Sequence, residues 1–286
     1  MVGMDDIRRA VYAGSFYPGD EEDLFRMMED LFTEAGDGTS TRDHKPKALI
    51  LPHAGYIYSG AVAARGYREV MGRKYSKIIL IGPYHFNPMK GHYFRGPGPA
   101  SYSRLETPLG NIEYDRETAA RLASALGVEY QNGAHGVEHS LEVQLPFIVK
   151  CLPGIPVSLL LMGECKLTDT KKLAQELSTL LKDGDFLILV STDLSHFYPY
   201  NRALELDEKT LGFIENGQVN ELYEWDNSMG GMLCGVDGVL TVMQLAKLLG
   251  WSDALRLAYQ TSGDRGGGKR EVVGYASLAY YPGGVN

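Results

Sequence analysis

Three histidines and an aspartate follow directly on short apolar runs of this 286-residue chain. His53 comes after Ala-Leu-Ile-Leu-Pro, His85 comes after Ile-Leu-Ile-Gly-Pro-Tyr, and Asp193 and His196 follow a run that ends at Val190. Short, unbroken apolar runs are typical of strands buried on both faces of a parallel sheet. The carboxyl ends of such strands meet at one edge, where open α/β folds bind ligands. We therefore expect these four side chains to lie together.

Cys234 is the candidate third ligand of a metal site with His53 and His85. Two histidines with a thiolate or carboxylate ligand form a usual donor set for iron, copper or zinc. The cysteine lies in Gly-Gly-Met-Leu-Cys-Gly, at the predicted start of a helix, where free backbone amides would stabilise a thiolate. The alternative is an inert core cysteine, which is how we interpret Cys151 and Cys165, because no glycine-rich turn flanks them.

Asp193 lies three residues before His196, and the pair is the candidate catalytic group. Asp193 can orient a ligand, accept a proton or bind a metal, whereas its alternative role is to cap a turn after the strand. A single histidine is more often a satisfied, hydrogen-bonded residue than a ligand, and we interpret His44 and His92 in that way. Histidines at corresponding strand ends favour a shared function for His53, His85 and His196.

A further histidine pair lies in His135-Gly-Val-Glu-His139, which matches the inverted zinc-protease signature H-x-x-E-H. That chemistry needs both histidines on one face of a helix. The glycine inside the motif and the Asn-Gly pair before it indicate a loop that enters a helix, so we reject the protease interpretation. We expect His139, Glu142 and Gln144 to line the pocket instead, with a polar helix start as the alternative.

Strands that alternate with helices predict an α/β fold with a mixed, mostly parallel central sheet sandwiched by helices. We expect no linker, and a single domain over residues 1–286. The predicted strands are Ala48–Leu51, Lys77–Ile81, Ile155–Met162, Asp185–Val190 and a closing hairpin of Ala254–Gln260 with Glu271–Tyr280. Predicted helices include those capped by Asp20, Ser59 and Asp115, one over Ser140–Lys150 and one from Gly230 to Leu249. Predicted loops include Gly36–Lys45 and Asn87–Arg104.

The composition excludes several classes of protein. The formal net charge is −8, and no Lys/Arg-rich block suggests binding to nucleic acid or to a membrane surface. No apolar run reaches the length of a membrane span. The first residues, Met-Val-Gly-Met-Asp-Asp, lack the apolar region of a secretory signal. Three scattered cysteines do not form a disulfide framework, so we expect a cytoplasmic protein.

Several motifs of this chain resemble, in the same order, those of the MEMO family (mediator of cell motility). They are Leu51-Pro-His-Ala-Gly-Tyr-Ile-Tyr-Ser-Gly60, Ile81-Gly-Pro-Tyr-His85, Glu138-His-Ser-Leu-Glu-Val-Gln-Leu-Pro146, Ser191-Thr-Asp-Leu-Ser-His196 and Cys234-Gly. The early Ala13-Gly-Ser-Phe-Tyr17 and the late Gly274-Tyr-Ala-Ser-Leu-Ala279 match the family as well. The resemblance covers almost the entire chain, and the compact sequence resembles a prokaryotic, archaeal member.

The resemblance implies a fold similar to that of class III extradiol ring-cleaving dioxygenases, which are non-haem iron enzymes. It implies metal binding by His53, His85 and Cys234, with Asp193 and His196 at further pocket positions. The dioxygenases use a glutamate as third ligand, and Cys234 departs from that pattern. A thiolate is softer than a carboxylate and favours copper or a redox role, so ring cleavage is not carried over.

The resemblance also implies partners. Members of the family are linked to copper or iron handling and, in animals, to phosphotyrosine-bearing receptor peptides. Prokaryotic members resemble one part of a three-part system with a radical-SAM protein and an AMMECR-type protein. An archaeal-type protein is not expected to have the receptor partner.

Three functions are consistent with these residues. The first is a redox protein or non-haem oxidoreductase that holds iron or copper, with His196 as acid/base and Asp193 orienting it or helping to hold the metal. The second is a non-catalytic module whose pocket binds a peptide or a small anionic ligand. The third is a thiol-dependent hydrolase or transferase, with Cys234 as nucleophile and His53 or His196 as base.

Overall fold

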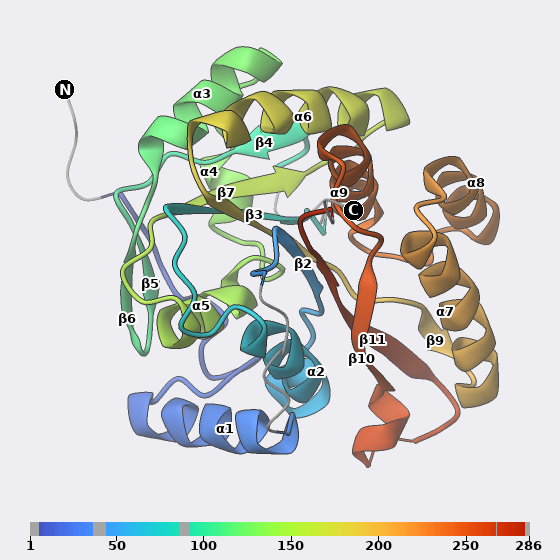
Figure 1. Ribbon diagram of the computed structural model, residues 1–286. Helices are drawn as coiled ribbons and strands as arrows, with labels where there is room; N and C mark the ends of the chain where they lie inside the picture. The colour runs from blue at the N-terminus through green and yellow to red at the C-terminus, as the bar shows by residue number, and fades with distance from the viewer. Residues whose placement is uncertain (1–5, 37–43, 86–91, 267, 284–286) are drawn as a thin grey trace.

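The larger of two β-sheets lies at the centre of the molecule between helices, and the smaller one lies at the left-hand side of Figure 1. The computed structural model describes residues 6–36, 44–85, 92–266 and 268–283. The larger sheet has the strand order β10-β11-β2-β8-β3-β7-β4, with β9 paired to β11, and the smaller one has the order β1-β5-β6. The predicted α/β class with a mixed central sheet between helices is therefore confirmed.

The parallel centre of the larger sheet carries the strand ends that matter for function. Its strands β2 (Ala48–Leu51), β8 (Phe186–Ser191), β3 (Lys77–Pro83) and β7 (Val157–Met162) pair in parallel. Antiparallel strands flank this centre, namely β4 (Pro97–Pro99) on one side and β11 (Val272–Tyr280), β10 (Leu255–Thr261) and β9 (His196–Tyr198) on the other. The closing hairpin of β10 and β11 was predicted correctly.

Side chains of the central strands alternate between two cores, as the pleat of a strand requires. Leu49 and Leu51 join the core under α1 (Glu21–Glu34), α2 (Tyr56–Arg68) and α5 (Leu145–Cys151). Ile50 joins the opposite core under α6 (Leu167–Leu180) and α9 (Val236–Leu249). The remaining helices are α3 (Arg116–Leu126), α4 (Asn132–His135), α7 (Tyr200–Glu215) and α8 (Val219–Met229), and the short 3₁₀ turns are Glu142–Gln144, Leu181–Asp183 and Ser262–Arg265.

Helix starts test the capping predictions directly. Asp20 and Asp115 accept backbone N–H groups at the starts of α1 and α3, as predicted. Ser59 was wrongly predicted as a cap, because α2 already begins at Tyr56 and the Ser59 hydroxyl donates to the Ala54 carbonyl instead.

Two further helices are shorter than predicted, and both start beside the candidate site. The predicted helix from Gly230 begins only at Val236. Gly230 is the left-handed C-cap of the preceding helix and Gly231 also has a positive φ angle, so neither residue can start a new helix. The segment predicted as a helix from Ser140 starts with a turn and the 3₁₀ helix Glu142–Gln144 before α5 begins at Leu145.

The predicted loop Asn87–Arg104 contains a short strand. Its first part, residues 87–91, lies outside the described residues, as do residues 37–43 of the other predicted loop. β4 is fully buried beside β7, and β5 (Arg104–Thr107) pairs with β6 (Gly110–Glu113) and with β1 (Ile7–Arg8). Gly98 in β4 has no room for a side chain, because a Cβ would meet Gln131 and Phe94.

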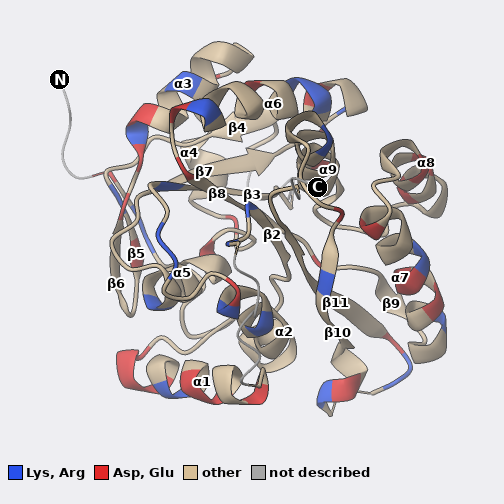
Figure 2. Ribbon diagram, in the orientation of Figure 1, with Lys and Arg blue, Asp and Glu red and all other residues tan. Residues whose placement is uncertain are grey.

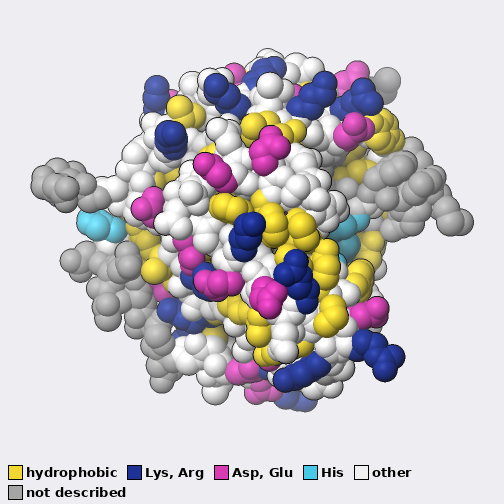
Figure 3. Space-filling view, turned by 90° about the vertical axis from the view of Figure 1, so that its right-hand side faces the viewer, with side chains coloured by type: hydrophobic (Ala, Val, Ile, Leu, Met, Phe, Trp, Pro, Cys, Tyr) yellow, Lys and Arg dark blue, Asp and Glu magenta, His cyan; other side chains and the backbone are white. Residues whose placement is uncertain are grey.

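Charged residues are frequent in the helices and the loops, while the central strands carry few of them (Figure 2). On the face drawn in Figure 3, cationic and anionic side chains are interspersed with apolar ones. Among the described residues, no helix combines the length and the apolar character that crossing a bilayer requires.

Gly274 in β11 allows the sheet to approach α7 closely. A Cβ at this position would lie 1.9 Å from Oδ2 of the buried Asp207. That carboxylate accepts the Ser195 backbone N–H and the Tyr259 hydroxyl, so it ties the loop before His196 to helix α7 and strand β10.

We expect Gly274→Ala to lower the free energy of unfolding by about 1–3 kcal/mol, because the added methyl displaces Asp207. Gly212→Ala is the matched control. Gly212 lies within α7 with nothing within 4 Å of an added Cβ, so the change should raise stability by about 0.5–1 kcal/mol. Urea unfolding measures both variants, and equal stability of Gly274→Ala and wild type would contradict the packing argument.

Candidate metal centre

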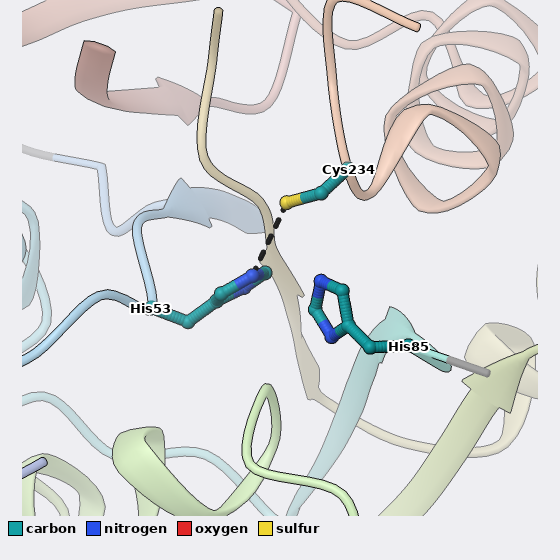
Figure 4. A group of neighbouring side chains, drawn as sticks. All are labelled: His53, His85 and Cys234. Atoms are coloured by element: carbon teal, nitrogen blue, oxygen red, sulfur yellow. Dashed lines mark hydrogen bonds between the residues drawn. The ribbon is translucent and has the colours of Figure 1, made fainter. Parts of the chain in front are cut away.

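His53, His85 and Cys234 point toward one another at the carboxyl edge of the parallel sheet (Figure 4). His53 follows β2, His85 follows β3, and Cys234 lies in the turn before α9. One ligand atom from each residue lies within 4.8 Å of the other two. The closest pair is His53 Nε2 and Cys234 Sγ, which are 3.1 Å apart. The three residues predicted as metal ligands therefore meet in one place.

The tautomer of His53 follows from the hydrogen bonds of Ser191. The Ser191 hydroxyl donates its one proton to the Ser140 carbonyl at 2.7 Å and accepts from Gln144 Nε2 at 3.1 Å. Nδ1 of His53 lies 2.9 Å from the same hydroxyl oxygen. Because that hydroxyl has no second proton, Nδ1 must carry the hydrogen. Nε2 of His53 is therefore left unprotonated and faces Cys234.

His85 is oriented by the buried carboxylate of Glu138. Nδ1 lies 2.9 Å from Oε1 of Glu138, and the His85 backbone N–H donates to Oε2 at 2.6 Å. The carboxylate is 3% exposed and the His85 side chain 38%, so the group is accessible from the His85 side. An Nδ1–H that bonds to a carboxylate again leaves Nε2 as the free nitrogen.

Cys234 lies in an environment that differs from the predicted helix start. Its Sγ accepts the backbone N–H of Asp193 at 3.1 Å, and the neighbouring Gly235 N–H donates to Thr192 Oγ1. Burial raises the pKa of the Cys234 thiol, and the negative charge of Asp193 adds to this effect. The prediction of a thiolate stabilised by a helix terminus is therefore wrong for the metal-free protein, because desolvation outweighs the one amide that reaches the sulfur.

Burial also shifts the pKa of the other titratable groups of the site. For His85, burial alone would lower the pKa, but the hydrogen bond and negative charge of Glu138 raise it. Burial lowers the pKa of His53, and the neighbouring His85 and His139 lower it further, so His53 is neutral at pH 7. Burial likewise lowers the pKa of His196. Burial raises the pKa of Asp193 to about 7, although backbone N–H groups of His53 and Ala54 oppose the shift.

Asp193 and His196 both lie beside the His53–His85–Cys234 group, but in different ways. The Asp193 side chain accepts the His53 backbone N–H at 2.8 Å, and its own backbone N–H reaches Cys234. It therefore links two of the three candidate ligands. His196 is half-buried at the start of β9, close enough to lower the pKa of His53 when it is protonated. Phe197, which follows it, has φ of 62° and is 70% exposed.

Of the three residues predicted to line a pocket, His139, Glu142 and Gln144, only His139 lies beside the candidate ligands. The His139 ring stacks on His85, with centroids 4.6 Å apart, and contacts His53 at 5.5 Å. Gln144 is buried behind the site, where it donates to Ser191 and to the Pro52 carbonyl. Glu142 faces away from the site toward Arg8.

Arg8 and Glu142 form a buried ion pair that fastens the N-terminal segment to the loop of residues 135–142. Arg8 is 2% and Glu142 1% exposed. Arg8 also donates to the carbonyls of His135 and Glu138, while Glu142 accepts the Tyr17 hydroxyl and the Val11 and Tyr12 N–H groups. This pair holds Phe16 where its ring lies 4.6 Å from that of His139.

Two residues of the site were not predicted, Ser191 and Glu138. Ser191 ends β8 and directly precedes the Thr-Asp pair, so its place at the strand end was the available signal. Glu138 precedes His139 inside the H-x-x-E-H motif. Its role depends on contact with His85, 53 positions earlier in the chain, which no local pattern shows. His135, the other histidine of that motif, is buried elsewhere with Nε2 on the Gly98 carbonyl.

The donor set fits a transition-metal ion. Two imidazoles direct Nε2 toward a thiol, and each imidazole is held through Nδ1 by an oxygen, the usual arrangement of histidine ligands. Nitrogen and sulfur donors suit iron, copper and zinc rather than magnesium or calcium.

Comparisons with known proteins agree with the sequence motifs. A family model described as Memo-like protein matches residues 8–279. A MEMO1 family protein of Methanobrevibacter smithii is 34% identical over 287 residues, covering 95% of this chain and 98% of the relative. A MEMO1 family protein of Aquifex aeolicus is 32% identical over 284 residues, covering 96% and 99%. Among solved structures, an uncharacterized protein of Escherichia coli K12 aligns with a TM-score of 0.49 and 13% identity, covering 82% of this chain and 99% of its own.

We expect Arg8→Met to lower the free energy of unfolding by about 3–5 kcal/mol, because it leaves the buried Glu142 carboxylate without its cation. Arg9→Met is the matched control. Arg9 pairs with Glu106 at the surface, where the side chains are 65% and 37% exposed, and its loss should cost about 0–1 kcal/mol. Urea unfolding of both variants measures the difference, and equal losses would show that the buried pair has no special role.

Proposed function

Because this chain belongs to the Memo-like protein family, we propose that it is a metal-binding redox protein or non-haem oxidoreductase. His53, His85 and Cys234 would hold one iron or copper ion at the carboxyl edge of the sheet. Its ligand or substrate would be a small molecule or a peptide that approaches from the partly exposed His85 side.

One observation carries the proposal. One ligand atom of each of two histidines and a cysteine lies within 4.8 Å of the others, and each imidazole bonds an oxygen through Nδ1, which leaves Nε2 facing the shared site. A solitary buried histidine needs only a hydrogen-bond partner. Two histidines whose hydrogen-bonded nitrogens face away from a shared thiol are instead arranged to bind something between them.

A bound iron or copper ion would supply one-electron redox chemistry or dioxygen activation. Metal binding requires that Cys234 lose its proton, which burial opposes in the free protein. The Asp193 backbone N–H would then donate to the thiolate sulfur and stabilise its charge. His53 needs no such change, because it is already neutral.

We assign the acid/base role to His196 and the orienting role to Asp193. The lowered pKa of His196 keeps its imidazole neutral at pH 7, so that it can accept a proton from a bound substrate. The Asp193 carboxylate holds the His53 backbone, which favours positioning over direct metal ligation.

The contact between Cys234 and His53 also favours a second candidate, a thiol-dependent hydrolase or transferase. Sγ and Nε2 are 3.1 Å apart, and Ser191 orients the imidazole through Nδ1, as in a nucleophile–base–orienter arrangement. The raised pKa of the Cys234 thiol is evidence against a thiol enzyme, because a catalytic cysteine needs a lowered pKa.

We expect protein purified without oxygen or chelators to contain close to one iron or copper ion per chain. His53→Ala and Cys234→Ser should each abolish this metal content, because either change removes a donor atom. Elemental analysis measures the metal. His44→Ala and Cys165→Ser serve as controls that remove the same residue types away from the site, and both should retain the metal.

Wild-type protein that takes up no metal, even after reconstitution with iron, copper and zinc, would contradict the proposal. The site would then be that of the non-catalytic module, whose pocket binds a peptide or small ligand. In that case Cys234→Ser should leave ligand affinity nearly unchanged.

We expect Cys234 in the metal-free protein to react slowly with iodoacetamide at pH 7. The rate should rise about tenfold per pH unit toward pH 9, because the thiolate fraction rises by that factor below the raised pKa. Mass spectrometry follows the modification. Urea-unfolded protein is the reference, in which all three cysteines should react at the rate of ordinary thiols. Fast alkylation of folded Cys234 at pH 7, independent of pH, would favour the thiol enzyme.

A further inference from the structure

We propose that Glu138 is a positioning residue for the metal site: its carboxylate fixes the orientation and tautomer of His85 and holds His139 against the same ring. The inference rests on the proposed metal site. It assigns a role to the one acidic side chain of the H-x-x-E-H motif, for which neither protease chemistry nor helix capping accounts.

The contacts of Glu138 are divided between the backbone and the two rings. Oε2 accepts the His85 backbone N–H, and Oε1 accepts the backbone N–H groups of His139 and Ser140 at 2.8 and 2.9 Å. The Nδ1 atoms of His85 and His139 also lie near Oε1, at 2.9 and 3.1 Å. One carboxylate therefore fixes both the main chain and the side chain of a candidate ligand.

The backbone of Glu138 is itself held in place. Arg8 donates to its carbonyl at 2.6 Å, and the Ser140 hydroxyl donates to the carbonyl of Pro83, at the end of β3. The side chain is 3% exposed, and the hydrogen bonds from the two histidines lower its pKa although burial alone would raise it. The carboxylate is thus ionised and rigid, as an orienting group must be.

The same atoms could also be considered a second metal site, since His85, Glu138 and His139 bring three ligand atoms within 4.8 Å of one another. The hydrogen bonds argue against it. The backbone N–H groups of His139 and Ser140 and the Nδ1–H of His85 already donate to Oε1, the carboxylate oxygen that lies near both Nδ1 atoms. An ion could bind between Oε1 and the two rings only by displacing these donors.

His139 restricts the His85 ring from the side. Its ring is stacked on His85, with an interplanar angle of 21°, and Phe16 covers it from the N-terminal segment. Rotation of the His85 ring would break its bond to Glu138 and disturb this stack. His85 is therefore preorganised although its side chain is 38% exposed.

The test compares Glu138→Gln with Glu142→Gln, the same change at an equally buried carboxylate four residues away that bonds Arg8 and Tyr17 instead of a histidine. We expect Glu138→Gln to weaken Co²⁺ binding by about 10–100-fold and to change the visible Co²⁺ spectrum, while the stoichiometry stays at one ion. Glu142→Gln should lose stability in urea but keep the Co²⁺ affinity and spectrum of wild type.

Equal Co²⁺ affinity and spectra for Glu138→Gln and Glu142→Gln would overturn the positioning role. A wild type that binds two ions, with one lost in Glu138→Gln, would make Glu138 a ligand and overturn it as well. A wild type that binds no Co²⁺ or Zn²⁺ at all would remove the metal site itself, which is a different failure.

A second measurement on the wild-type protein does not depend on how the variants fold. Nitrogen-15 NMR of the Zn²⁺-loaded protein should show His85 with hydrogen on Nδ1 and metal on Nε2. A signal from metal bound to Nδ1 of His85 would overturn the proposal.

Discussion

A hydroxyl group has one proton to donate, and at the centre of this site that proton is already used. Ser191 donates to the Ser140 carbonyl and accepts from Gln144, so His53 can only donate to it through Nδ1. The direction of these hydrogen bonds decides that Nδ1 of His53 carries the hydrogen. Nε2, which faces Cys234, is therefore unprotonated. Tyr67 and the Pro52 carbonyl hold Gln144 in turn. The tautomer of His53 thus depends on donors and acceptors of buried residues, namely Ser191, Gln144 and Tyr67.

The sequence predicted which residues meet at the candidate site better than it predicted the residues that orient them. His53, His85 and Asp193 were found because each follows a buried strand, and parallel strands place their carboxyl ends together whatever the details of packing. Cys234 was found through its glycine-rich turn, but the expected helix start was wrong, because Gly230 and Gly231 adopt positive φ angles that delay α9. The thiol's environment therefore depends on loop 192–193, which comes from another strand end.

Glu138, Ser191 and Arg8 could not be assigned in this way. Their roles consist of contacts with residues 53 to 138 positions away, and such contacts exist only in the folded chain. The only local pattern that includes Glu138 is the H-x-x-E-H motif, and its protease interpretation does not apply here. Arg8 lies in a two-residue strand too short to show a period. A polar residue that supports a ligand is recognisable from its partners, whereas the ligand itself is recognisable from its place on the sheet.

The hydrogen bond between His53 and Cys234 joins positions that are 181 residues apart. At a synthesis rate of about 5–20 residues per second, His53 leaves the ribosome well before the cysteine exists. Strand β11, which pairs with β2 beside His53, follows later still. A nascent chain can offer two imidazoles but not the thiol, and it has no closed sheet to orient them. If this centre holds the proposed ion, the ion would bind late, after synthesis is complete, and the cell would have to supply it to a finished protein.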